Sequence, residues 1–179
     1  MPKRLLLLLV VLAILVLTFS IFSDSYSNTI AAQVSSCTNN TVIRPEFALP
    51  DVQGNIHSIK EWDGKYIVLN FWATWCAPCR EEIPEFIKLQ EEYGASNLQF
   101  IGVAIDDAVS VDSFSLEMGI NYPNLIAEAE GIELAKKYAN ITGALPYSVI
   151  INPNKEIIFR HVGLLNREKI LDVIQLTKG

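Results

Sequence analysis

The hydrophobic pattern divides the chain into three parts. Residues 5–22 are apolar at every position except Thr18 and Ser20. A membrane-spanning helix needs about 17–25 apolar residues, whereas the apolar core of a cleaved signal peptide needs about 7–15. The length favours a signal anchor over residues 1–22. Residues 23–45 are rich in Ser, Asn and Thr without apolar periodicity, which predicts a flexible linker to a folded domain over residues 46–179.

Two alternatives for the N-terminus stay open. Ala31-Ala32 could end a cleavage site, and residues 34–37 resemble a lipoprotein box in which Cys37 would be acylated. Both features lie well beyond the apolar run, and this favours the anchor. Lys3 and Arg4 precede the run, so the positive-inside rule places them in the cytoplasm and the chain after residue 22 outside it.

Periodicity within the domain predicts alternating strands and helices. Residues 47–59 read as two short extended pieces around a turn at Gly54-Asn55. Continuous apolar or β-branched runs predict strands at 66–72, 98–105, 147–151 and 156–160. Helical patterns occur at 79–93, 110–119, 130–139 and 167–177, with Ser110 and Asn166 as candidate N-caps. The expected order after the N-terminal pair is β-α-β-α-α-β-β-α, an α/β fold in which a mixed sheet carries helices on both faces.

The charge and the residue composition exclude some classes of function. Beyond residue 22 the chain carries 12 basic and 20 acidic residues, a net charge of −8. Phosphate binding requires a basic face, so nucleic acid is not an expected partner. Two histidines and three cysteines leave little material for a metal site, and we expect neither a metal nor an organic cofactor.

The candidate catalytic motif is Trp75-Cys76-Ala77-Pro78-Cys79, which lies between a predicted strand and a predicted helix. Cys76 would lie at the helix N-terminus, where free amides and the helix dipole favour a thiolate. Pro78 suits the first turn, where its missing N–H costs nothing. A redox-active pair is therefore favoured over a purely structural disulfide or a zinc half-site, which would need a second Cys or His pair.

These residues resemble the active-site segment of the thioredoxin superfamily, here residues 71–80. The segment is most similar to the TlpA/ResA-like, membrane-anchored, extracytoplasmic thiol:disulfide oxidoreductases that act in cytochrome c maturation. Further matching features are Pro84, the Gly143–Tyr147 loop with Pro146, Gly163, and an extra segment at 106–126 that resembles the insertion of this group. The resemblance covers about residues 46–178 and implies a thioredoxin-like fold.

The resemblance also implies roles for individual residues. Cys76 and Cys79 would form the redox disulfide, and Pro146 would follow a cis peptide bond that turns the Leu145 backbone toward Cys76. Substrate contacts would come from Trp75, Ala77, Pro78, Leu145 and Pro146.

Thioredoxin has a buried Asp six residues before its first active-site cysteine, but this chain has Asn70 there, which cannot titrate. The anchored group instead has an acid three residues after the second cysteine, here Glu82. That spacing places Glu82 on the helix face of Cys79. We expect Glu82 to accept the Cys79 proton or to tune its pKa, rather than to belong to the solvated acidic face.

The predicted function is a membrane-tethered enzyme that reduces disulfides in exported, cysteine-containing clients such as apocytochrome c. The resemblance implies a single pass through the inner membrane, a domain on the periplasmic side, and a membrane electron donor of the DsbD/CcdA type. The alternatives are a disulfide-forming oxidase of the same fold, a copper-delivery protein, and, least favoured, a thiol peroxidase. The sequence leaves open the client, the donor, the direction of electron flow and the oligomeric state.

Overall fold

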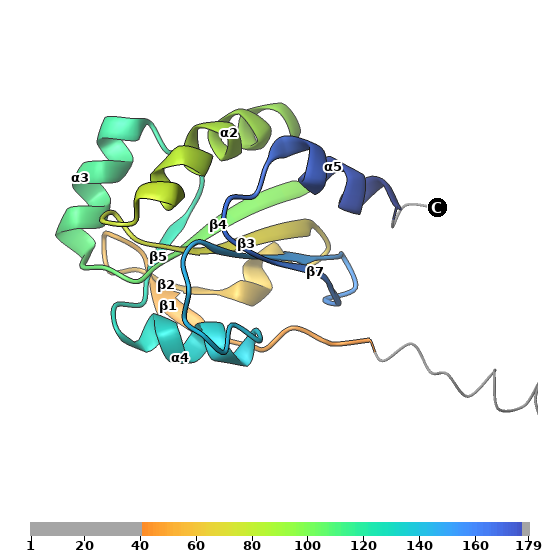
Figure 1. Ribbon diagram of the computed structural model, residues 1–179, viewed down its shortest axis with the longest axis horizontal. Coiled ribbons are helices and arrows are strands. Elements are labelled where there is room, and N and C mark those ends of the chain that lie inside the picture. Colours follow the sequence, from red (N-terminus) through yellow and green to blue (C-terminus); the bar gives the residue numbers. More distant parts are fainter. Residues whose placement is uncertain (1–40, 177–179) are drawn as a thin grey trace, which may run out of the picture. The chain divides into compact units, whose positions relative to one another are not determined.

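The computed structural model describes residues 41–176 of the chain (Figure 1). The predicted anchor at 5–22, the Ala31-Ala32 pair, Cys37 and most of the predicted linker lie outside these residues. Within 41–176, no helix combines the length and the apolar character that a membrane crossing requires.

The central sheet has five strands in the order β5-β4-β3-β6-β7. The strands are β3 (Tyr66–Trp72), β4 (Leu98–Ala104), β5 (Asn124–Ile126), β6 (Tyr147–Ile151) and β7 (Ile157–Val162). β4 is parallel to β3 and to β5, whereas β6 is antiparallel to both of its neighbours, β3 and β7. The described domain is thus the expected mixed α/β sheet.

Helices cover both faces of this sheet (Figure 1). One face carries α2 (Ala77–Tyr93), α3 (Ala108–Met118) and α5 (Arg167–Leu176), and the other carries α4 (Glu130–Lys137) and the short 3-10 helix η1 (Ile59–Trp62). Side chains alternate along a strand. Accordingly Leu69 of β3 packs in the apolar cluster that contains α4, whereas Val68 packs in the cluster that contains α2 and α5.

An antiparallel pair, β1 (Ala48–Pro50) and β2 (Ile56–Ser58), precedes the sheet as predicted. Gly54 lies in its turn with a φ of +86°, a conformation that glycine adopts without strain. Residues at the end of the predicted linker already contact the domain. The carbonyl of Val42 accepts a bond of 2.8 Å from the Ile157 amide, and the Arg44 amide donates to the carbonyl of Lys155 at 2.9 Å.

Two local features differ from the sequence prediction. β5 was not predicted, because three residues are too few to show an alternating pattern. Helix α3 begins before Ser110, since Asp107 is its N-cap and Asp107 Oδ1 accepts the Ser110 amide at 2.9 Å. A carboxylate accepts this bond more strongly than a hydroxyl does. Asn166 does cap α5, where its Oδ1 accepts the Lys169 amide at 3.0 Å.

Candidate active site

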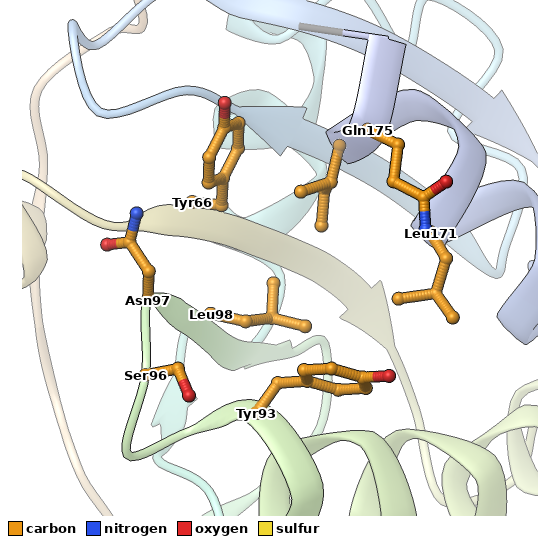
Figure 2. Close-up of a pocket in the computed structure, with 8 residues that line it drawn as sticks. Tyr66, Tyr93, Ser96, Asn97, Leu98, Leu171 and Gln175 are labelled. Carbon is orange, nitrogen blue, oxygen red and sulfur yellow. The ribbon is translucent and has the colours of Figure 1, made fainter. Parts of the chain in front are cut away.

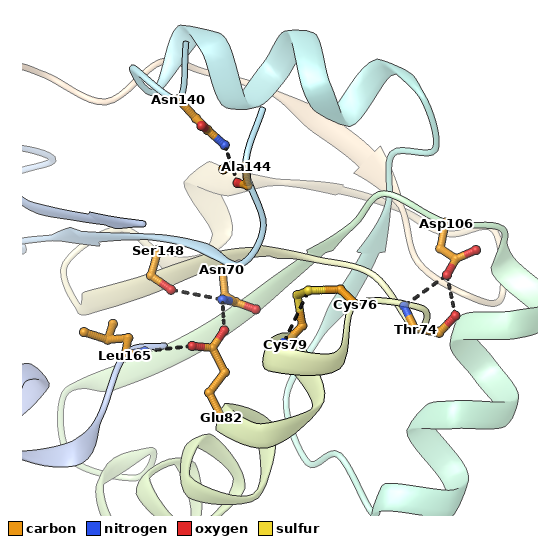
Figure 3. Close-up of a disulfide and its surroundings, with 10 residues drawn as sticks. All are labelled: Asn70, Thr74, Cys76, Cys79, Glu82, Asp106, Asn140, Ala144, Ser148 and Leu165. Atoms are coloured by element: carbon orange, nitrogen blue, oxygen red, sulfur yellow. Dashed lines mark hydrogen bonds between the residues drawn. A yellow bond between two sulfur atoms is a disulfide. The ribbon is translucent and has the colours of Figure 1, made fainter. Parts of the chain in front are cut away.

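The cysteine pair lies where the central strand β3 ends and α2 begins (Figure 3). A turn at 73–76 joins the two elements and is closed by a 3.2 Å bond from the Cys76 amide to the Ala73 carbonyl. Cys76 is the N-cap of α2, and its sulfur accepts the Cys79 amide at 3.3 Å. The two cysteines are joined by a disulfide, so the structure represents the oxidised form.

The two sulfurs belong to an apolar cluster but sit close to the surface on one side. Cys76 is 6% exposed and Cys79 is fully buried, while the adjacent Trp75 side chain is 68% exposed. Ala77 and Pro78 are exposed as well. The accessible side of the pair is therefore that of Cys76, next to Trp75, whereas Cys79 has no exposed surface.

The loop before β6 also belongs to this site. The peptide bond between Leu145 and Pro146 is cis, and Leu145 packs against the apolar cluster that holds both cysteines. The carbonyl of Pro146 accepts the Gly163 amide at 2.8 Å, so this loop is fixed to the end of β7. The structure thus brings the Leu145–Pro146 segment to the cysteine pair, as the resemblance implied.

Glu82 lies beneath the disulfide on the inner face of α2 and is only 4% exposed (Figure 3). Its Oε1 accepts the Asn70 side-chain amide at 2.7 Å, and its Oε2 accepts the Leu165 backbone amide at 2.9 Å. The same Asn70 nitrogen donates to Ser148 Oγ at 3.0 Å. Glu82 is thus held by β3 and by the loop after β7, and it does not belong to the solvated acidic face.

Burial is the main influence on the charge of Glu82. Loss of hydration raises the pKa of Glu82 to about 7, although the hydrogen bonds from Leu165 and Asn70 act in the opposite direction. A carboxyl group with such a pKa can exchange a proton near neutral pH. Glu82 also lines an open groove of about 470 Å³ beside Leu164 and Leu165.

Three parts of this arrangement were not predicted from the sequence. Ser148 and the Leu165 amide complete the polar cluster around Glu82, and Asp106 bonds to Thr74 in the turn before Cys76. A usable signal existed for Ser148, because it is a lone polar residue in the apolar run 147–151, as Asn70 is in 66–72. No sequence signal points to the Leu165 amide.

The two histidines lie outside this cluster. Hydrogen bonds from His57 to Glu61 at 2.8 Å and to Asp51 at 3.1 Å raise the pKa of the His57 imidazole. His161 contacts the carbonyl of Leu164 at 2.9 Å. Within the described part of the chain, no group of three or more His, Cys, Asp or Glu side chains is arranged to hold a metal ion.

A small cavity of about 110 Å³ lies between α2 and α5 (Figure 2). Tyr66 and Leu98, the first residues of β3 and β4, line it. Cys76 follows the opposite, carboxyl end of β3, so this cavity does not serve the cysteine pair.

A CxxC disulfide at the N-terminus of a helix, facing a cis-proline loop on a mixed sheet, defines a thioredoxin-like thiol-disulfide exchange domain. A family model described as the AhpC/TSA family matches residues 42–160, and the chain belongs to this family.

Proteins that are similar to this chain in sequence or structure belong to the same class. The thiol-disulfide oxidoreductase ResA of Halalkalibacterium halodurans is 31% identical over 133 residues, or 74% of this chain and 73% of that protein. ResA of Geobacillus thermodenitrificans is 26% identical over 179 residues, covering 98% of this chain and 97% of that protein. A crystal structure of a thiol:disulfide interchange protein from Chlorobium tepidum has a TM-score of 0.71 and 27% identity, covering 80% of this chain and all of that one. The chain is a thiol-disulfide oxidoreductase.

Proposed function

We propose that this enzyme is a membrane-tethered reductase that reduces disulfides in exported client proteins, such as apocytochrome c. The observation that carries the proposal is the asymmetry of the pair. Cys76 lies at a helix N-terminus beside the exposed Trp75, whereas Cys79 is buried on the helix face that holds Glu82. The first position suits attack on a client, and the second suits an internal step that releases it.

In the first step, the Cys76 thiolate of the reduced enzyme attacks one sulfur of a client disulfide. A bond forms between Cys76 and that sulfur, the client S–S bond breaks, and the second client sulfur leaves as a thiolate. The start of α2 stabilises the attacking thiolate, because the Cys79 amide donates to the Cys76 sulfur and the positive end of the helix dipole lies there.

In the second step, Cys79 loses its proton and attacks the sulfur of Cys76. The Cys76–Cys79 bond forms, the mixed disulfide breaks, and the client leaves with two reduced sulfurs while the enzyme holds the disulfide seen here. The two electrons that reduce the client come from the dithiol. We assign the acceptance of the Cys79 proton to Glu82, which passes it to solvent through the adjoining groove.

Three considerations support the reductase direction and the tether. The ResA relatives align over most of their length, including one alignment that extends over nearly all of this chain. The apolar segment at 5–22 suits an inner-membrane anchor with the domain on the periplasmic side. An exported compartment is oxidising, so a reductase there requires a donor, for which a membrane thiol protein of the DsbD/CcdA type is the natural candidate.

The redox state of the pair in growing cells tests the direction of electron flow. Cells expressing a Cys37→Ser variant are quenched in acid, free thiols are alkylated with a mass tag, and the gel shift counts reduced cysteines. A mostly reduced pair is the expected result. A mostly oxidised pair that persists when the donor is overproduced would contradict the reductase and favour the oxidase.

The other candidate functions predict different outcomes from the purified, reduced protein. A copper carrier would bind Cu(I) stoichiometrically at Cys76 and Cys79 and would not turn over disulfides. A thiol peroxidase would consume peroxide. The buried Cys79 one helical turn from Cys76 instead suits rapid closure of an internal disulfide.

A further inference from the structure

The turn that presents Cys76 has little hydrogen bonding of its own. It is closed only by the bond from the Cys76 amide to the Ala73 carbonyl. The exposed ring of Trp75 stands on this turn and gives it no buried anchor on its outer side. Cys76 is held on its inner side by the apolar cluster and by its bond from the Cys79 amide, and on the outer side the turn relies on what holds Thr74.

Asp106, two residues beyond the end of β4, holds Thr74 (Figure 3). One oxygen, Oδ2, accepts both the Thr74 amide at 3.0 Å and the Thr74 hydroxyl at 2.5 Å. The other oxygen accepts the Asp107 amide at 3.0 Å, so the carboxylate is itself oriented. Hydrogen bonds to a charged acceptor are shorter and stronger than those between neutral groups.

The backbone beside Asp106 is fixed to the same strand that leads to the cysteines. The Ile105 amide donates to the carbonyl of Trp72 at 2.8 Å, which extends the β3–β4 pairing up to Asp106. Immediately afterwards, Asp107 caps α3, whose Phe114 ring lies 5.5 Å from that of Trp72. Asp106 thus joins the turn to a rigid strand end and to the start of the 106–126 segment.

We propose that Asp106 is a positioning residue for disulfide exchange, because its two bonds to Thr74 keep Cys76 at the N-terminus of α2. Loss of these bonds lets the turn move, and Cys76 then loses part of the amide field that stabilises its thiolate. The Cys76 thiol should titrate at higher pH, and exchange with a client should slow.

The test compares substitutions that separate charge from hydrogen bonding. Asp106→Ala removes the charge and both acceptors, whereas Asp106→Asn removes the charge but retains an oxygen that can accept both Thr74 donors. Both variants lose the acceptor of the Asp107 amide, so the difference between them reports the two bonds to Thr74. Asp107→Ala is the matched control, since it removes the neighbouring carboxylate and the α3 cap but leaves the bonds to Thr74 in place.

Two readouts are measured on the full-length, detergent-solubilised protein carrying Cys37→Ser. The first is the pH midpoint of Cys76 alkylation in a Cys79→Ser background. The second is the exchange rate with a chromogenic peptide disulfide, for which we expect about a 3- to 10-fold loss in Asp106→Ala, the size of one or two lost hydrogen bonds. The midpoint should be higher in Asp106→Ala than in Asp106→Asn, and Asp107→Ala should match the parent in both readouts.

Equal midpoints and equal rates in Asp106→Ala and Asp106→Asn would overturn the proposal. If Asp106→Ala does not fold, Thr74→Val replaces it, because that change removes only the hydroxyl donor and keeps the side-chain shape. Thr74→Val should slow exchange in the Asp106 parent, and it should slow exchange to a similar degree in the Asp106→Asn variant, which keeps an acceptor for the Thr74 hydroxyl. An undiminished rate in Thr74→Val would then reject the role of this contact.

Discussion

The two cysteines share one disulfide, but they lie in different surroundings. Around Cys76 the groups are backbone amides, an exposed Trp75 and a turn held by Asp106. Cys79 lies fully buried, and Glu82, one helical turn further along α2, is held by Asn70 and the Leu165 amide. This difference matches the proposed division of the exchange, in which the helix N-terminus stabilises the Cys76 thiolate and the buried Glu82 accepts the Cys79 proton.

The largest expected effect separates the two sulfurs directly. Cys76→Ser should lower exchange with a peptide disulfide at least about a thousandfold, because the attacking nucleophile is lost. Cys79→Ser should still attack but should accumulate the mixed disulfide, which non-reducing mass spectrometry detects. If Cys76→Ser rather than Cys79→Ser formed the adduct, the assigned roles would be reversed.

The next effect concerns the cost of ionising Glu82 in the interior. The folded-state pKa of about 7 lies above the ordinary value of 4.5. The protonated Glu82 carboxyl therefore contributes its full stability below about pH 4.5, and this contribution is lost as pH rises through 7. Between those limits, the free energy of unfolding of the oxidised parent should fall by up to about 3 kcal/mol relative to Glu82→Gln.

Chemical denaturation at several pH values measures this difference, with the disulfide intact so that the cysteines do not titrate. Glu81→Gln is the matched control, because Glu81 is the neighbouring residue on α2 but is exposed. The interior assignment fails if Glu82→Gln and Glu81→Gln show the same pH dependence.

A smaller effect is expected for the amide that holds Glu82. Asn70→Leu leaves Glu82 Oε1 without its donor, which should raise the pKa of Glu82 further and cost about 1–3 kcal/mol of stability at alkaline pH. The loss should shrink at acidic pH, where Glu82 is protonated. Ser148→Ala, which removes only the other partner of Asn70, should cost less in the same denaturation series. An Asn70→Leu loss independent of pH would separate Asn70 from the charge of Glu82.

The smallest effect is expected on the Cys76 side. Trp75→Ala should slow exchange with a peptide disulfide about 3- to 10-fold through lost contact area, while exchange with glutathione disulfide and the melting temperature stay unchanged. Leu116→Ala is a suitable control, because Leu116 is also largely exposed (76%) but lies near the C-terminal end of α3 and not in the turn before Cys76. Equal losses for both disulfides would show that Trp75 acts on Cys76 itself and not on the client.

The sequence predicted those features that depend on local spacing. The CxxC motif placed Cys76 at a helix start, and three-residue spacing placed Glu82 on the buried face of α2 with Cys79. The partners of Glu82 were beyond such reasoning, because the Leu165 amide is 83 residues away and carries no side-chain signal. The same holds for Asp106, whose contact with Thr74 depends on how β3 and β4 end together.

The most direct test of the division between the two cysteines is the pH dependence of the second step. Acid-quench flow with mass spectrometry follows decay of the mixed disulfide from about pH 6 to pH 9, in the parent and in Glu82→Gln. If Glu82 accepts the Cys79 proton, the parent rate should rise and level off near pH 7. Glu82→Gln should then be about 10- to 100-fold slower at neutral pH and should keep rising toward pH 9. Identical rate profiles for the two proteins would contradict the role of Glu82.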